Sequence, residues 1–289
     1  MLTFNLFFST ILLPLITIAL LWRRPRRPFA PWLTTFVMAL GVVGFSVLAA
    51  PWGWFGVPMR FAIAVLFAIA LILSLVRRVP EEQAEETPVR MLVKVVVGIF
   101  FGIVGVGVLR AHSVPPNPID LAFPMRMGTF LVAHGGSHPA ANLHFQDPRQ
   151  RYAVDFVKLT RMGMRASGIH PSDPKAYAIF GTEVLSPCDG VVTATVDRFA
   201  DGSPDPKNPL GNHIVLRCGD ADVVLAQLQR GSISVQKGAT VRRDTAVARV
   251  GHSGLSIEPH LHVHAERKGV AVPITFERRW LVRNAIIRR

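Results

Sequence analysis

Four long apolar stretches occupy the first 110 residues or so of this 289-residue chain and constrain its fold more than any other feature. About 20 apolar residues in a helix are enough to cross the hydrocarbon core of a bilayer, which is about 30 Å thick. Four such runs in succession are not typical of the buried helices of a soluble protein. The sequence therefore predicts an N-terminal α-helical membrane region with four spans, at about residues 2–22, 32–50, 60–77 and 91–109.

Arginines in the connections between these stretches predict the orientation of the chain. They lie between the first and second spans and between the third and fourth: Arg23, Arg24, Arg26, Arg27, Arg77, Arg78 and Arg90. Basic loops stay on the cytoplasmic side, so we expect the N-terminus and everything after the fourth span to lie outside. No basic residue precedes the first apolar run and no small-residue cleavage site follows it, which predicts a retained anchor. The expected location is the cytoplasmic membrane, multi-pass, with an extracytoplasmic C-terminal domain.

The second half of the chain has a different composition, with short β-type runs separated by Gly, Pro and Asp. We predict a four-helix membrane anchor over 1–112, a Pro-rich linker over 113–124, a mainly antiparallel β domain over 125–275 and a basic C-terminal tail over 276–289. Many short strands are typical of an all-β domain. The predicted strands are 152–157, 190–196, 212–217, 223–227, 231–235 and 246–250.

Gly98 and Gly102 form a GxxxG pattern in the fourth stretch, which is typical of a helix-packing face. The only two cysteines, Cys188 and Cys218, do not form a CxxC pair, so a cysteine metal site is excluded. They lie at the outer ends of a predicted hairpin, where a disulfide and a pair of buried thiols both remain open.

The formal net charge of +13 raises the question of an anionic partner. Much of the basic charge lies beside apolar segments or near the C-terminus, and no basic stripe with interleaved aromatic residues is present. We therefore expect no nucleic acid partner. A lipid bilayer flanked by basic residues, or an anionic envelope polymer, accounts better for the charge.

Residues 258–264, with the sequence EPHLHVH, contain three histidines at alternate positions. In a β-strand, alternate side chains lie on one face, so His260, His262 and His264 point the same way. Leu261 and Val263 then face a core. Zinc is bound by His nitrogen and carboxylate oxygen atoms, with three protein ligands in a catalytic site. This pattern favours a metal site, and the alternative is a surface strand with exposed histidines.

Several spaced motifs together resemble the M23 (lysostaphin/LytM-type) zinc metallopeptidase domain, over roughly residues 128–270. The motifs are residues 187–192, Gly211 with Asn212, Gly231 with Ser232, Val235 and Gly238, residues 251–254, and residues 259–262. This family cuts the peptide cross-links of bacterial peptidoglycan. The resemblance implies an M23-like fold (a duplicated hybrid motif), a Zn²⁺ cofactor and a peptidoglycan peptide as substrate.

The resemblance also implies which residues bind the metal. His262 and Asp155 match two of the family's zinc ligands. The family's third ligand, a His four residues before the Asp, is replaced here by Arg151, and a guanidinium has no lone pair to offer. We predict His144 instead, because its Asn-x-His context resembles one branch of the family. The alternatives are His134 and His138.

A second departure concerns catalysis. His260 matches the family's catalytic His, and the resemblance implies that it accepts a proton from the attacking water. The family's other assisting His stands in an Ala-His-Leu context, and this chain has Gln227 there. Glutamine does not titrate near neutrality and supplies only a neutral hydrogen bond. Glu258 is expected either to orient a ligand histidine or to be a solvent-exposed turn carboxylate.

These observations predict a membrane-anchored zinc metalloendopeptidase that acts on peptidoglycan cross-link peptides outside the cytoplasmic membrane. The alternative is a catalytically degenerate M23-like domain that binds wall peptides or activates another cell-wall hydrolase, and Gln227 favours it. A lipoyl- or biotinyl-like carrier is a third interpretation, from the rhythm of residues 238–244. It has no Lys at a suitable hairpin tip and leaves the histidines unexplained.

Overall fold

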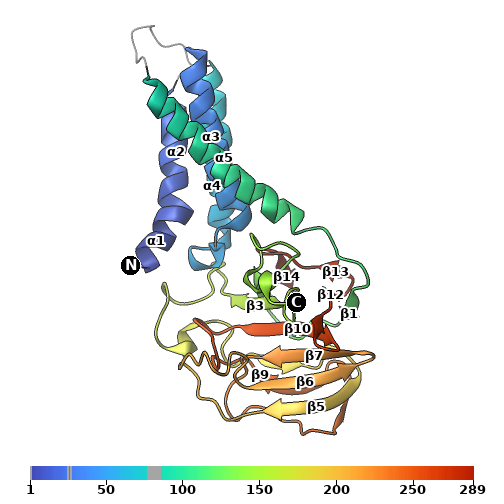
Figure 1. Cartoon of the computed structure of the whole chain (residues 1–289). Coiled ribbons are helices and arrows are strands. Elements are labelled where there is room, and N and C mark those ends of the chain that lie inside the picture. Colours follow the sequence, from blue (N-terminus) through green and yellow to red (C-terminus); the bar gives the residue numbers. More distant parts are fainter. Residues whose placement is uncertain (1, 25, 27, 77–85) are drawn as a thin grey trace. The chain divides into compact units, whose positions relative to one another are not determined.

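The structure is a computed structural model that describes residues 2–24, 26, 28–76 and 86–289 (Figure 1). The chain divides into two compact units, Met1–Leu109 and Arg110–Arg289. Arg27, Arg77 and Arg78, which contribute to the predicted orientation, lie outside the described residues.

The first unit is helical. Its elements are α1 (Leu2–Phe7), a π-helical turn η1 (Phe8–Leu12), α2 (Leu13–Arg23), α3 (Phe29–Ala49), a 3₁₀ turn η2 (Trp52–Trp54), α4 (Val57–Val76) and α5 (Pro88–Arg110). Among the described residues, four helices are long and apolar enough to cross a membrane: Thr3–Arg23, Phe29–Ala49, Val57–Val76 and Pro88–Arg110. The four predicted apolar helices are therefore confirmed, with boundaries a few residues from those expected.

Helices α3 and α5 approach each other closely at a pair of glycines. A Cβ atom on Gly98 would lie 2.6 Å from the carbonyl oxygen of Val37, and a Cβ on Gly41 would collide with the backbone of Gly98. A Cβ on Gly102 would meet nothing within 4 Å. Of the predicted GxxxG pair, only Gly98 therefore lies at this helix crossing.

The second unit is a mostly antiparallel β domain, as predicted. A nine-stranded sheet has the order β14-β2-β3-β10-β7-β6-β5-β8, with β11 paired to β10; β1-β12-β13 and β4-β9 form two smaller sheets. Only β1 and β12 pair in parallel among the described strands. The strands are β1 (Ile119–Leu121), β2 (Thr129–His134), β3 (Val154–Leu159), β4 (Glu183–Leu185), β5 (Gly190–Val196), β6 (His213–Cys218), β7 (Ala221–Ala226), β8 (Thr240–Val241), β9 (Ala246–Arg249), β10 (Leu261–Arg267), β11 (Val270–Ala271), β12 (Ile274–Phe276), β13 (Arg279–Trp280) and β14 (Ile286–Arg288). Two 3₁₀ turns, η3 (Leu143–Gln146) and η4 (Pro174–Ala176), complete the unit.

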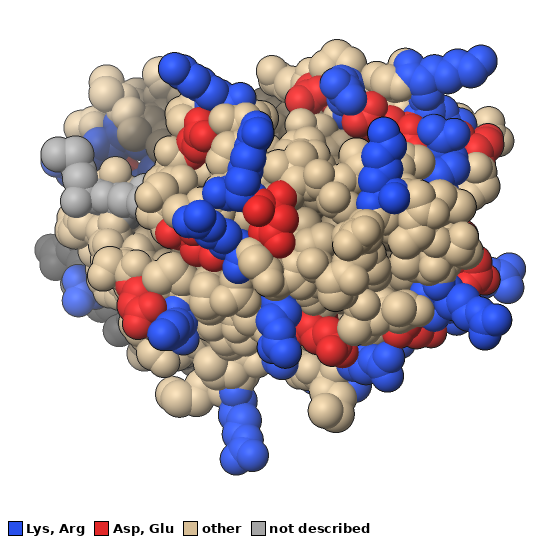
Figure 2. Space-filling view, turned by 90° about the horizontal axis from the view of Figure 1, so that it is seen from below, with Lys and Arg blue, Asp and Glu red and all other residues tan. Residues whose placement is uncertain are grey.

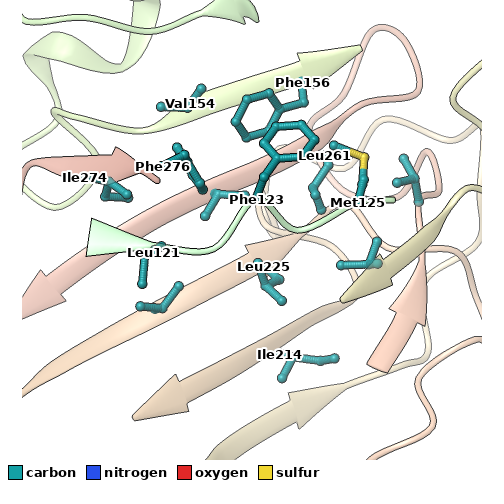
Figure 3. Close-up of a cluster of buried hydrophobic side chains, with 14 of the residues drawn as sticks. Leu121, Phe123, Met125, Val154, Phe156, Ile214, Leu225, Leu261, Ile274 and Phe276 are labelled. Atoms are coloured by element: carbon teal, nitrogen blue, oxygen red, sulfur yellow. The ribbon is translucent and has the colours of Figure 1, made fainter. Parts of the chain in front are cut away.

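One apolar core lies between the large sheet and the smaller ones, and Figure 3 shows part of it. Phe123 packs edge-on against Phe156 with ring centroids 5.1 Å apart, and Phe156 packs against Phe276 at 5.2 Å. Such aromatic pairs add to the stabilisation from buried apolar area. The core fixes β3 and β10, because their inward side chains belong to it.

Two segments, 113–124 and 276–289, differ from the sequence-based prediction because they contribute strands to the β domain. Residues 113–124 are not only a linker, because β1 pairs with β12 and Phe123 is buried in the core. Residues 276–289 are not a tail, because β14 pairs with β2 and Ile287 is 4% exposed. Because arginines surround this short strand in the sequence, its few apolar residues do not stand out as a strand pattern.

The strand predicted at 231–235 is absent from the described chain. Asp197 accepts hydrogen bonds from the backbone N–H groups of Gly231 and Ile233, at 2.7 and 3.3 Å. These N–H groups therefore donate to a carboxylate, whereas in a β-strand they would donate to carbonyl groups of a neighbouring strand.

Cys188 and Cys218 form a disulfide, with their Cα atoms 6.0 Å apart. The bond links the start of the β5–β6 hairpin to its end, so the structure favours the disulfide over the pair of buried thiols. On the face that Figure 2 shows, Lys and Arg side chains are interspersed with Asp and Glu rather than gathered in one continuous patch.

Candidate metal centre

A row of polar side chains crosses three neighbouring strands of the large sheet. Asp155 of β3 lies opposite His262 of β10 on one side and His134 of β2 on the other. Alternation produces this row, because Val154 and Phe156 face the core and Asp155 faces away from it. The same holds in β10, where Leu261 and Val263 are core residues, as predicted.

Asp155 contacts two imidazoles, one with each carboxylate oxygen. Its Oδ1 lies 2.9 Å from Nδ1 of His262, and its Oδ2 lies 2.9 Å from Nε2 of His144. One ligand atom from each of the three residues lies within 4.8 Å of the others, and this is the one group of three or more His, Cys, Asp or Glu found among the described residues. Two imidazoles and a carboxylate are a donor set that fits zinc.

Asn142 holds the turn that carries His144. It is the N-cap of η3, and its side-chain oxygen accepts a hydrogen bond from the backbone N–H of His144 at 3.1 Å. The two N–H groups of its Nδ2 are shared among the carbonyl oxygens of Gly136, Arg151 and Ala153, at 3.0–3.2 Å. Asn142 is 1% exposed, so these backbone groups are satisfied by this amide in the protein interior.

The three residues lie in a cleft of about 470 Å³. Both predicted catalytic residues, His260 and Gln227, line it, and so does His134. His138 does not: its ring accepts a hydrogen bond from the N–H of Ala140 instead.

His260 is oriented by the backbone of the residue before Pro259. Its Nδ1 lies 2.9 Å from the carbonyl oxygen of Glu258 and its Nε2 lies 3.8 Å from Oδ1 of Asp155. A carbonyl only accepts, so Nδ1 carries the proton and Nε2 of the neutral ring has a free lone pair. In this tautomer, Nε2 is the ring nitrogen of His260 that can accept a proton, and it lies on the side of Asp155.

Gln227 presents an acceptor rather than a donor. Its Nε2 donates to the carbonyl oxygen of Pro209 at 3.0 Å, and no partner for its Oε1 is found among the described residues. The residue is 4% exposed. A buried unpaired acceptor is costly, so Oε1 is suited to a ligand N–H or a water.

A chain of hydrogen bonds extends from His262 away from the cleft. His262 Nε2 lies 2.9 Å from Nδ1 of His264, and His264 Nε2 lies 3.2 Å from Glu266. Arg149 then donates to both oxygens of Glu266 at 3.1 Å. The carboxylate of Glu266 accepts a hydrogen bond from Nε2 of His264, so Nδ1 of the neutral His264 ring accepts one from Nε2 of His262. Nδ1 of the neutral His262 ring therefore carries no proton, and its lone pair points toward the candidate metal centre.

The contribution of Arg149 was not predicted. Nothing in the sequence pairs it with Glu266, which lies 117 residues later. His264 is 2% exposed within β10 and contacts His262 directly.

Electrostatics keeps the carboxylate charged and His262 neutral. Burial by itself would raise the pKa of Asp155, but the neighbouring charges of His144 and His260 outweigh it and hold that pKa well below its usual range. Burial lowers the pKa of His262 to about 3. Burial also opposes protonation of His144, yet attraction to Asp155 raises its pKa. A charged carboxylate and a neutral buried imidazole are the forms that bind metal.

Glu258 has neither of the expected roles. It is 8% exposed, not a solvent-exposed turn residue, and its carboxylate pairs with the buried Arg165 rather than with a ligand histidine. It acts on the cleft through its backbone carbonyl, which orients His260.

The β domain with this cleft defines a metallopeptidase-like module. Residues 175–273 match the model of Peptidase family M23, which confirms the resemblance found in the sequence. The matched range contains Gln227, His260 and His262 but not His144 or Asp155. No curated protein matches the chain closely enough to count as a relative.

Solved structures with related folds include three of different kinds. A SpoIIQ–SpoIIIAH pore-forming complex is 17% identical over 41% of this chain and 58% of that chain, with a TM-score of 0.28. A zinc-containing peptidase from Vibrio cholerae is 20% identical over 55% and 38%, with a TM-score of 0.29. The catalytic domain of the antimicrobial peptidase lysostaphin from Staphylococcus simulans is 19% identical over 42% and 72%, with a TM-score of 0.28. The chain thus spans less than two thirds of the first two, and likenesses of this size carry no information about activity.

Proposed function

We propose that this protein is a membrane-anchored zinc metalloendopeptidase that cleaves peptidoglycan cross-link peptides. The observation that carries the proposal is the cluster of His144, Asp155 and His262 in one cleft, beside His260. The match to Peptidase family M23 supports the reaction class, and the family resemblance supports the substrate.

Each residue has a role that its contacts support. His144, Asp155 and His262 would hold Zn²⁺, which supplies Lewis acidity at the scissile carbonyl when bound. His260 takes the proton of the attacking water on Nε2, since its Nδ1 is held by the carbonyl oxygen of Glu258. The free acceptor of Gln227 suits an N–H group of the peptide substrate.

We further propose that the β domain lies outside the cytoplasmic membrane. The described basic residues at the end of α2 and before α3, Arg23, Arg24 and Arg26, support a cytoplasmic position for the loop between these helices. The disulfide supports an oxidising compartment for the β domain, since such bonds are rare in the cytosol.

The test is the zinc content of the full chain purified in detergent, followed by digestion of purified peptidoglycan. We expect one zinc per chain in the wild type, lost in His144→Ala and in His262→Ala. His213→Ala is the matched control, because His213 begins β6 and does not line the cleft. A folded wild-type chain without zinc would contradict the peptidase proposal.

A second function is favoured by Gln227, which places no titratable group at this position of the cleft. In that case the domain binds wall peptides or activates another hydrolase. Zinc binding and retention on peptidoglycan without release of fragments would support this second function.

A further inference from the structure

His134 lies in the cleft without belonging to the group of three predicted metal ligands. It ends β2, where a register shift between Val132 and His134 inserts one extra residue, Ala133. Without this bulge, Ala133 would lie opposite Asp155, and with it His134 does. Bulges beside active sites commonly re-aim a side chain in this way.

Arg283 fixes the tautomer of His134. Its Nη1 donates to the carbonyl oxygen of Ala133 at 2.9 Å and lies 3.2 Å from Nδ1 of His134. A guanidinium has no acceptor, so Nδ1 must accept and the neutral ring carries its proton on Nε2. No hydrogen bond to this Nε2–H is present in the described part of the chain.

The cleft therefore contains two imidazoles whose Nε2 atoms, in the neutral form of each ring, have opposite capabilities. His260 Nε2 accepts a proton, and His134 Nε2 presents one.

We propose that His134 donates its Nε2–H to the carbonyl oxygen of the substrate as negative charge develops on it, an inference that rests on the peptidase activity proposed above. The water oxygen adds to the carbonyl carbon and gives a proton to His260, while the carbonyl electron pair moves onto the oxygen that His134 contacts. The pair then returns, the C–N bond breaks, and the leaving nitrogen takes the proton from His260. Gln227 has a different part in the cleft, because its unpaired atom is the acceptor Oε1, while its Nε2 donates one hydrogen bond to Pro209.

The test compares three substitutions of His134 in the full chain in detergent, with zinc content, kcat and KM measured on purified peptidoglycan cross-link peptides. His134→Leu removes the donor. His134→Asn keeps an acceptor for Arg283 but does not reach as far as Nε2, whereas His134→Gln places an amide donor at that reach. His138→Leu is the matched control, because this histidine lies outside the cleft.

We expect all four variants to retain zinc and wild-type KM. For His134→Leu and His134→Asn, kcat should fall about 100- to 1000-fold, the usual loss for one oxyanion donor, with partial recovery in His134→Gln. Zinc loss in His134→Leu would make the residue a ligand, and wild-type kcat in His134→Asn would make its role structural. Either result overturns this inference and leaves the peptidase proposal intact. A wild type that binds zinc but cleaves no peptide would overturn both this inference and the peptidase proposal.

Discussion

At the scale of single residues, the centre depends on side chains that never touch a substrate. Asn142 joins the turn carrying His144 to three backbone carbonyls and has no charge or reactivity of its own. His264 and Glu266 fix the ring of His262 from the far side. Such partners orient ligands and set their tautomers, so their loss should weaken metal binding as well as stability.

The first prediction concerns Asn142→Ala. Two buried carbonyls, a part-buried carbonyl and one N–H lose their partner, and each buried group left unsatisfied costs about 1–3 kcal/mol. We expect a lower unfolding midpoint and a weaker zinc affinity, because His144 is no longer held. Zinc titration with a competing chelator measures the second effect. Asn208→Ala is the control, since its amide contacts only Asp205 in a loop, and equal zinc affinity in both variants would contradict the role given to Asn142.

At the scale of the elements, alternate residues of β10 connect the candidate metal centre to an ion pair outside the cleft. Glu266 stands at the end of this row, between His264 and the largely exposed side chain of Arg149. The hydrogen bond from His264, followed by that from Arg149, lowers the pKa of Glu266 to about 2, below its ordinary 4.5.

This shift predicts a pH dependence of stability. A carboxylate with a depressed folded-state pKa stabilises the fold above its unfolded pKa, and that contribution is lost as pH falls through the folded pKa. The wild type should therefore unfold at a higher temperature than Glu266→Gln at pH 6, and the difference should shrink between pH 4.5 and pH 2. Thermal unfolding of both proteins across this range is the measurement. A difference that stays constant down to pH 2 would show that the charge of Glu266 does not stabilise the fold.

Helices α3 and α5 permit a sharper comparison, because two of the four glycines of α5 lie in different surroundings. In Gly98→Ala the new methyl would press on the backbone of α3, and such overpacking typically costs about 1–3 kcal/mol. Gly102→Ala adds the same methyl where nothing lies within 4 Å. We expect only Gly98→Ala to lower the thermal midpoint of the purified chain in detergent, followed by circular dichroism. Equal midpoints would mean that the α3–α5 crossing contributes little.

At the scale of the whole molecule, the sequence predicted those helices and strands whose hydrophobic pattern repeats locally along the chain. The apolar runs predicted the four helices, and short β-type runs predicted β5 and β6 to within a residue, whereas the alternating stretch 258–264 begins and ends three residues before β10. The sequence-based prediction failed for strands that form only because they pair with segments far away in the chain. The segments β1, β13 and β14 are only two or three residues long, and they are strands because β12 and β2 pair with them.

The candidate site likewise contains residues that the sequence predicted and a residue whose role it did not predict. Asp155 and His262 were identified from motifs, and the structure places them opposite each other in neighbouring strands. The role proposed for His134 could not be predicted from the sequence, because a bulge sets the direction of its side chain and Arg283, far along the chain, sets its tautomer. Neither a one-residue insertion in a strand pairing nor a contact 149 residues away leaves a local signal.

The last prediction connects the disulfide to the position of the β domain in the cell. Cys188 and Cys218 are 30 residues apart, and closing a loop of this length stabilises a fold by about 3–4 kcal/mol in the chain-entropy model. Cytosolic reductants keep such thiols reduced, whereas an extracytoplasmic domain retains the bond. In intact cells the two cysteines should therefore resist alkylation until a reductant is added.

The matched variant for this experiment is Cys188→Ser. It leaves Cys218 without its partner, so this thiol should become alkylated without reductant, and the β domain should unfold at a lower temperature. Alkylation of both wild-type cysteines without reductant would place the β domain in the cytosol. That outcome would contradict the orientation inferred from the arginines at the end of α2 and before α3, and it would separate the domain from a wall substrate even if the metal centre binds zinc.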